Sequence, residues 1–112
     1  MAAPLPAIVL VSEEHADEML AGFARYQAEY DVRVARSCHE ALTTTHDIVA
    51  EGGTVAMFAS ESVLPDAEVL HCFHKLREKV PTACEHTWRA LLQIGLVRPA
   101  TDRAAKSAEA RP

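Results

Sequence analysis

The chain has little glycine, few aromatic residues and no long apolar run. Only 4 of its 112 residues are glycine, and 5% are aromatic. No stretch approaches the 18 or so uninterrupted apolar residues of a membrane-spanning helix, which predicts a protein without a membrane segment. The apolar stretch of residues 1–11, "MAAPLPAIVLV", has no basic residue before it, so it indicates a first strand and not a secretory signal.

Basic residues are also scarce in most of the chain. Residues 1–97 hold 14 acidic and 7 basic side chains, a balance of −7, whereas residues 98–112 hold 4 basic and 2 acidic, a balance of +2. An acidic body argues against nucleic-acid binding, because phosphates are neutralised by clustered Lys and Arg. The three cysteines are odd in number and form no C-x-x-C pair, which predicts free thiols in a cytoplasmic protein.

The first third of the chain predicts a strand, a helix and a second strand. Residues 7–11, "AIVLV", are typical of a strand covered on both faces. Residues 12–30 predict a helix capped by Ser12, with an apolar stripe at helical spacing. The stripe consists of Met19, Leu20, Phe23, Tyr26 and Tyr30. Residues 31–36, "DVRVAR", alternate like a strand nearer the sheet edge.

Two further strand-helix units follow. Ser37 and Glu40 have the spacing of a capping box, and Gly52-Gly53 end the helix that it starts. The inner face of that helix is predicted to hold Leu42, Thr45, Ile48 and Val49. Residues 54–59 predict a buried strand. Asp66 is expected to cap a third helix, which Pro81 ends. Its apolar stripe holds Val69, Phe73, Leu76 and Val80.

Three strand-helix units with short links predict one α/β domain over residues 1–97. We expect a flavodoxin-like, doubly wound parallel sheet with strand order 2-1-3. Residues 84–97 are ambiguous: a fourth strand at residues 91–97 competes with a helix over residues 86–94, and Gly95 favours the strand. Residues 98–112 are rich in Ala, Arg and Pro and predict a disordered tail.

Carboxylates follow two of the predicted strands. Ser12, Glu13 and Glu14 come after the first strand, and Glu61 lies between two serines after the third. Neither turn contains the glycines of a phosphate-binding loop. Because the carboxyl ends of parallel strands form the functional crevice of such sheets, Glu13 and Glu61 are candidate ligands for a weakly bound Mg²⁺.

These turns resemble the receiver domain of two-component response regulators (the CheY-like family). "IVLVSEEH" matches the strand and acidic pair of that family, "VAMFASESVLP" matches the strand that ends in the phosphoacceptor aspartate four residues before a proline, and "SCHEAL" resembles its second helix. The resemblance covers residues 7 to about 83. It implies that Glu61 stands at the acceptor position and that Ser12, Glu13 and Glu14 line the acidic pocket. Within the family, the chain looks most like receivers fused to thioredoxin-reductase-like flavoproteins.

The chain also departs from the receiver pattern. Ser12 replaces the first acidic residue, and glutamate, one methylene longer than aspartate, replaces the acceptor. The Ser or Thr after the fourth strand and the Lys after the fifth cannot be assigned, because Lys106 lies in the predicted tail. The fifth strand and the last two helices have no counterpart, so the resemblance is to a receiver that is shortened at its C-terminal end.

We therefore expect a degenerate bacterial receiver that works without phosphorylation, as a regulatory or protein-interaction module. Glu61 would imitate the modified acceptor with one negative charge. The chain would not be an enzyme, would have no catalytic residues, and would carry no cofactor except a weak Mg²⁺. Its partner would be a protein or a fused effector module, and the apolar segment with Trp88, Leu91 and Leu92 could form a homodimer.

Other interpretations stay open at this point. Glu61 could be an ordinary loop carboxylate, and Glu13 and Glu14 could serve only the helix dipole. A working receiver could use another acceptor, Asp66. A third possibility is a small zinc-binding protein, for which the chain offers His71, Cys72, His74, Cys84 and His86.

Overall fold

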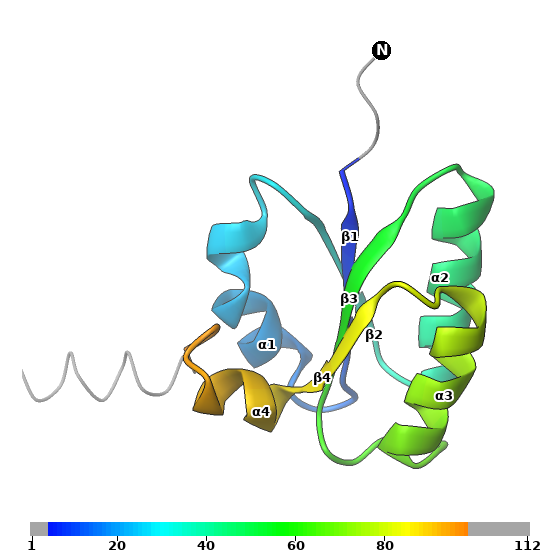
Figure 1. Cartoon of the computed structure of the whole chain (residues 1–112). Coiled ribbons are helices and arrows are strands. Elements are labelled where there is room, and N and C mark those ends of the chain that lie inside the picture. The colour runs from blue at the N-terminus through cyan, green and yellow to red at the C-terminus, as the bar shows by residue number, and fades with distance from the viewer. Residues whose placement is uncertain (1–4, 99–112) are drawn as a thin grey trace, which may run out of the picture.

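The computed structural model describes residues 5–98, which form one parallel sheet covered by helices on both faces (Figure 1). The strands are β1 (Ala7–Val11), β2 (Asp31–Ala35), β3 (Val55–Ser60) and β4 (Cys84–Thr87). Their order across the sheet is β2-β1-β3-β4, and every neighbouring pair is parallel. The predicted α/β class and the order 2-1-3 are confirmed, and β4 extends the sheet beside β3.

The helices lie on opposite faces of this sheet. α2 (Cys38–Ala50) and α3 (Val69–Lys79) cover one face, whereas α1 (Ala16–Gly22), the short 3-10 turn η1 (Ala24–Tyr26) and α4 (Trp88–Gln93) cover the other (Figure 1). Two apolar clusters result. Phe58 and Leu76 belong to the α2/α3 cluster, and Phe23 and Leu91 belong to the α1/α4 cluster. All five residues of β1 are buried because this strand is central and covered on both sides.

The Ser37 half of the predicted capping box forms at the start of α2. The Ser37 side chain accepts a hydrogen bond from the Glu40 N–H at 3.1 Å. The inner face of α2 is shifted from the predicted one: Thr45 and Ile48 are buried, but Val49 is half-exposed and Cys38 and Ala41 take the remaining core positions. Small residues suit this face because α3 packs closely against it.

The first helix is much shorter than the sequence predicts. α1 begins at Ala16, and its cap position is His15, not Ser12. The Ser12 side chain instead accepts the His15 N–H at 2.9 Å and closes a tight turn between β1 and the helix. The stripe at Phe23, Tyr26 and Tyr30 continues through η1 and the following turns, so it packs on the sheet without one continuous helix.

The segment after Ala83 also differs from the prediction. The fourth strand is formed by Cys84–Thr87, not by residues 91–97, and α4 follows it directly. Thr87 caps α4 by accepting the Ala90 N–H at 3.2 Å. Gly95 has a φ of +76°, the left-handed conformation that often ends a helix, so this glycine marks a helix end and not a strand.

The residues after α4 fold back onto η1. The Leu96 carbonyl accepts hydrogen bonds from the Tyr26 hydroxyl and the Arg25 guanidinium, each at 2.6 Å, and Val97 is buried. The predicted tail lies outside the described residues except for Arg98. Between residues 5 and 98, no helix is long and apolar enough to cross a membrane.

Candidate functional site

The turns after β1 and β3 meet at the carboxyl edge of the sheet. Val11 and Ser60, the last residues of these strands, are partners in the parallel register, and the Glu61 N–H donates to the Val11 carbonyl at 3.1 Å. Ser12 and Glu61 are therefore neighbours although 49 positions separate them. The predicted meeting of the two turns is confirmed.

Glu61 is held by groups of the β1–α1 turn. Its Oε1 accepts the backbone N–H of Glu13 at 3.0 Å, and its Oε2 lies 2.8 Å from Nδ1 of His15. The side chain of Glu61 is only 14% exposed, whereas that of His15 is 56% exposed. Both carboxylate oxygens therefore have a donor within the chain, and the carboxylate is turned toward β1 and away from solvent.

The two side chains favour each other's charged form. The hydrogen bond to Glu61 raises the pKa of His15; desolvation opposes this rise, and the negative charges of Glu61, Glu18 and Glu14 reinforce it. Desolvation alone would raise the pKa of Glu61, but the hydrogen bonds from His15, the Glu13 N–H and Ser12 outweigh it, so the net pKa shift is downward. The contact is thus a hydrogen bond that becomes an ion pair when His15 is protonated.

Ser12 fixes the geometry of this pair. It is fully buried, and its hydroxyl oxygen binds the N–H of His15, the residue whose ring reaches Glu61. On the other side of the turn, Arg36 donates to the Glu13 carbonyl at 3.3 Å. Ser12 therefore acts as a positioning residue in the place where the resemblance puts an acidic pocket residue.

Glu13 contributes its backbone to the site, whereas the sequence predicts that its carboxylate is a Mg²⁺ ligand. Its backbone N–H, not its carboxylate, binds Glu61, and the Glu13 and Glu14 side chains are exposed. Within residues 5–98, no three His, Cys, Asp or Glu side chains converge as a metal site would require. Both oxygens of Glu61 accept hydrogen bonds within the chain, so these residues offer few of the free oxygen ligands that Mg²⁺ prefers.

Two residues of the site escaped sequence reasoning. His15 was not distinguished because nothing in its local pattern shows that its ring reaches a residue 46 positions away. Thr87 ends β4 opposite Ser60, which is where the resemblance assigns a Ser or Thr. Thr87 was not assigned to this position because the fourth strand was predicted at residues 91–97, whereas β4 is formed by Cys84–Thr87. The Thr87 oxygen accepts the Ala90 N–H, so this residue also starts α4.

Asp66 does not cap α3 as predicted. Its two carboxylate oxygens accept the backbone N–H groups of Cys38 and His39, each at 2.9 Å, at the start of α2. The hydrogen bond from His39 lowers the pKa of Asp66, desolvation partly opposes it, and the Cys38 N–H lowers the pKa further. α3 begins after Glu68 without a side-chain cap. Asp66 thus ties the β3–α3 turn to α2.

The cysteines are also not all free. Cys38 and Cys72 form a disulfide that joins α2 to α3, with a Cα–Cα distance of 5.7 Å, and Cys84 is the free, exposed thiol. The expectation of three free thiols is wrong because the packing of α2 on α3 brings two of them together. Bonded in this way, Cys72 has no thiolate to offer a metal, which weakens the zinc interpretation.

The apolar residues expected to form a dimer contact belong to the core. Leu91 is fully buried, and the partly buried Trp88 and Leu92 pack against the α1/α4 cluster. The Trp88 ring lies 6.0 Å from that of Phe23, centroid to centroid. Leu91 in particular is not available to a partner in this fold, which corrects that expectation.

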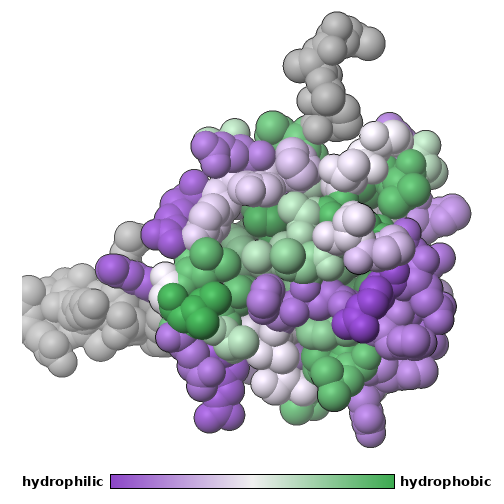
Figure 2. Space-filling model, viewed as in Figure 1, coloured by the Kyte–Doolittle hydropathy of each residue, from purple (hydrophilic) through white to green (hydrophobic). Residues whose placement is uncertain are grey.

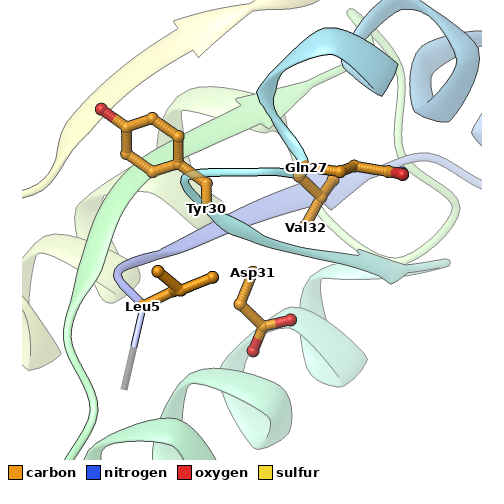
Figure 3. Close-up of a pocket in the computed structure, with 5 residues that line it drawn as sticks. All are labelled: Leu5, Gln27, Tyr30, Asp31 and Val32. Carbon is orange, nitrogen blue, oxygen red and sulfur yellow. The ribbon is translucent and has the colours of Figure 1, made fainter. Parts of the chain in front are cut away.

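A shallow pocket lies at the opposite end of the sheet. It has a volume of about 460 Å³ and lies beside the start of β2. Figure 3 shows the side chains that line it, Leu5, Gln27, Tyr30, Asp31 and Val32. Because β2 begins at Asp31, this pocket is at the amino end of the strands and is separate from Glu61.

The strand order, the flanking helices and the meeting of the two turns define the flavodoxin-like fold of receiver domains. A solved structure with this fold is the signal receiver domain of an HD domain-containing protein from Pseudomonas fluorescens Pf-5. It is similar over 78% of this chain and 60% of its own length, with a TM-score of 0.58 and 16% sequence identity. The chain thus spans less than two thirds of that solved chain, and the likeness shows the fold. No family model and no curated protein matches the chain.

Proposed function

We propose that this chain is a pseudo-receiver, a receiver-like module that regulates or binds a protein partner without being phosphorylated. The observation that carries the proposal is the state of Glu61. Both of its oxygens are bound, by the Glu13 N–H and by His15, and its side chain is largely buried. A carboxylate whose two oxygens are hydrogen-bonded within the chain and largely shielded from solvent is poorly placed to attack a phosphoryl donor.

In this proposal His15 supplies the positive charge that a metal ion supplies in a working phosphoacceptor site. When protonated, the His15 ring places a positive charge 2.8 Å from Oε2 of Glu61, where it would repel a metal cation. Glu61 would therefore keep its hydrogen bond to His15, and the site would not switch between an unmodified and a phosphorylated form. The module would have no catalytic activity, its partner would be a protein or a fused effector module, and its location would be cytoplasmic.

The second candidate acceptor, Asp66, is less well supported. Its two oxygens are bound by backbone N–H groups at the start of α2, so a phosphoryl group there would displace the α2 cap. The proposal consequently includes Asp66 as a structural residue of the β3–α3 turn.

Treatment with acetyl phosphate and Mg²⁺ tests the proposal. We expect no covalent phosphate on the wild-type chain by intact mass under conditions that modify a working receiver run in parallel. A stoichiometric, base-labile adduct that disappears in Glu61→Gln would overturn it. An adduct that persists in Glu61→Gln but disappears in Asp66→Asn would instead establish Asp66 as the acceptor.

A further inference from the structure

The Cys38–Cys72 disulfide joins the starts of two helices. Cys38 is the first residue of α2, and Cys72 lies in the first turn of α3. Both residues are buried, at 3% and 1% exposed. The β3–α3 turn, residues 61–68, leads directly into α3 and contacts the start of α2 through Asp66. The disulfide therefore fixes the C-terminal end of this turn against α2.

Apart from the disulfide, few contacts hold the β3–α3 turn against α2. Within residues 5–98, the N–H groups of residues 62–68 donate to no other backbone group, and α3 starts without a side-chain cap. The segment is held by the two hydrogen bonds that Asp66 accepts and by the buried side chains of Leu64 and Val69. Its closed position thus depends on a small number of side-chain contacts and on the disulfide.

Part of the apolar surface of this segment already faces solvent. Val63 in the turn and Leu70 in the first turn of α3 are 77% and 79% exposed. Figure 2 shows hydrophobic surface at the lower end of α3, where the turn enters the helix. A segment with few backbone hydrogen bonds and little apolar burial opens at a lower free energy than the whole domain. Opening of this segment brings Cys72 to solvent, whereas Cys38 stays on α2.

We propose that the Cys38–Cys72 pair is a site of reversible thiol–disulfide exchange with a dithiol reductant, and that its redox state controls the opening of the β3–α3 turn. The reductant reaches the disulfide when this turn and the first turn of α3 open. The bond closes the turn in the oxidised chain and releases it in the reduced chain. The proposal concerns groups other than Glu61 and His15 and does not depend on the proposed function.

The exchange transfers two electrons from the reductant to the cysteine pair. A thiolate of the reductant attacks Sγ of Cys72, the bond between the two cysteines breaks, and Cys38 leaves as a thiolate. The second thiolate of the reductant then attacks the reductant sulfur of this mixed disulfide, which closes a disulfide within the reductant and releases Cys72 as a thiolate. The two cysteine thiolates take up the two protons that the reductant thiols gave up. The oxidised form of the dithiol reverses these steps.

The start of α2 favours Cys38 as the leaving group. The positive end of a helix dipole stabilises a thiolate, and Cys38 is the first residue of this 13-residue helix. In the closed turn, the Asp66 carboxylate occupies the same helix end through the N–H groups of Cys38 and His39. Because Asp66 moves away with the turn, these N–H groups can face the thiolate when the turn is open.

The rate of reduction tests whether the opening is local. In the Cys84→Ser background, where only the pair can react, millimolar dithiothreitol should reduce the native chain without urea, as followed by alkylation and intact mass. The logarithm of the rate should rise with urea at less than about half the slope of global unfolding, because that slope scales with the surface that opening exposes. A rate with the full global slope, or a disulfide that resists dithiothreitol until the chain unfolds, would overturn the proposal.

Two variants in the turn test which contacts keep it closed. Asp66→Ala removes both hydrogen bonds to α2 and should speed reduction about fivefold, the usual effect of losing a helix cap. Ser62→Ala is the matched control, since Ser62 lies in the same turn with an exposed side chain, and it should leave the rate unchanged. Equal rates in the two variants would contradict the proposal, because the turn would then not control access to the disulfide.

Proteolysis of the native chain by a glutamate-specific protease tests the effect of the redox state. Reduction should speed cleavage after Glu68, at the end of the turn, by roughly tenfold or more, because the turn loses its covalent link to α2. Cleavage after Glu29, an exposed residue before β2, should keep its rate. Equal acceleration at both sites would mean that the bond stabilises the whole fold without controlling the turn, and the proposal would fail. None of these measurements depends on whether Glu61 is phosphorylated.

Discussion

Replacing Gly22 by alanine tests whether the segment after β4 packs as the structure shows. Gly22 is the last residue of α1, and its φ is not positive, so alanine can adopt its backbone conformation. A Cβ added there would overlap Cη2 of Trp88 and would lie 3.3 Å from Cζ2 of Trp88 and 3.2 Å from the Arg98 carbonyl oxygen. Alanine at position 22 therefore stabilises α1 through its higher helix propensity, but it crowds Trp88 and the Arg98 carbonyl.

The two effects have opposite signs and different sizes. Replacing a glycine by alanine at a compatible position stabilises a protein by about 0.4–1 kcal/mol. Crowding a packed site by one methyl group costs about 1–3 kcal/mol. Trp88 cannot yield freely, because its ring packs against Phe23. We expect a net loss of about 1–2 kcal/mol, since the crowding is larger than the gain in helix stability.

The assay is urea and thermal unfolding of four proteins: wild type, Gly22→Ala, Trp88→Leu and the double variant. The loss should lower the melting temperature of a domain of this size by roughly 5–15 °C. In the Trp88→Leu background, where the crowding atoms are gone, the same Gly22→Ala change should stabilise the protein slightly. If Gly22→Ala stabilises both backgrounds equally, Trp88 does not lie over α1 and the placement of α4 is wrong.

Three further predictions concern the β3–α3 turn and its neighbours. Asp66→Ala should destabilise the chain by about 1 kcal/mol in urea titrations, and Asp66→Asn by less, because the amide keeps one acceptor for the α2 cap; equal losses would contradict the capping role. Reduction of the Cys38–Cys72 disulfide, which spans 34 residues, should lower the free energy of unfolding by about 3–4 kcal/mol, as measured with and without reductant; no change would mean that the bond does not form. The pKa of His15, followed by NMR, should be raised above its ordinary 6.5 in the wild type and fall in Glu61→Gln, and an unchanged value would remove the ion pair from the site.

The directions of the pKa shifts of His15 and Glu61 define the pH range in which the pair stabilises the fold. Because the pKa of His15 is raised on folding, its contribution is present below 6.5 and is lost as pH rises through the folded value. Because the pKa of Glu61 is lowered, its contribution is present above 4.5 and is lost as pH falls through its folded value. The pair is therefore strongest between these two ordinary values, between about pH 4.5 and 6.5.

Errors of prediction cluster where local signals compete. Residues 84–97 were ambiguous because aliphatic residues suit both strands and helices. Gly95 then favoured the strand, although it ends a helix with positive φ. Ser12 was expected to cap α1, but it accepts the N–H of His15 in a turn that precedes the helix. Gly95 ends an element and Ser12 accepts a backbone N–H, as expected from their residue types. The element that Gly95 ends and the N–H that Ser12 accepts are different from those predicted.

The sequence by itself determined the elements whose signals lie within a few residues. The apolar runs specify β1 and β3, the Ser37–Glu40 pair starts α2, and the alternation of strands and helices leads to a parallel sheet because crossovers are right-handed. It also placed the turn of Glu61 beside the turn after β1, since parallel strands end at a common edge.

Only the tertiary structure decided what each side chain contacts across long separations. His15 reaches Glu61 over 46 positions, Asp66 caps a helix that begins 28 positions earlier, and Cys38 meets Cys72 across 34. These contacts depend on how helices pack against the sheet and on the rotamers that this packing selects. No local pattern of residues encodes them, because their free energy arises only when distant segments are brought together.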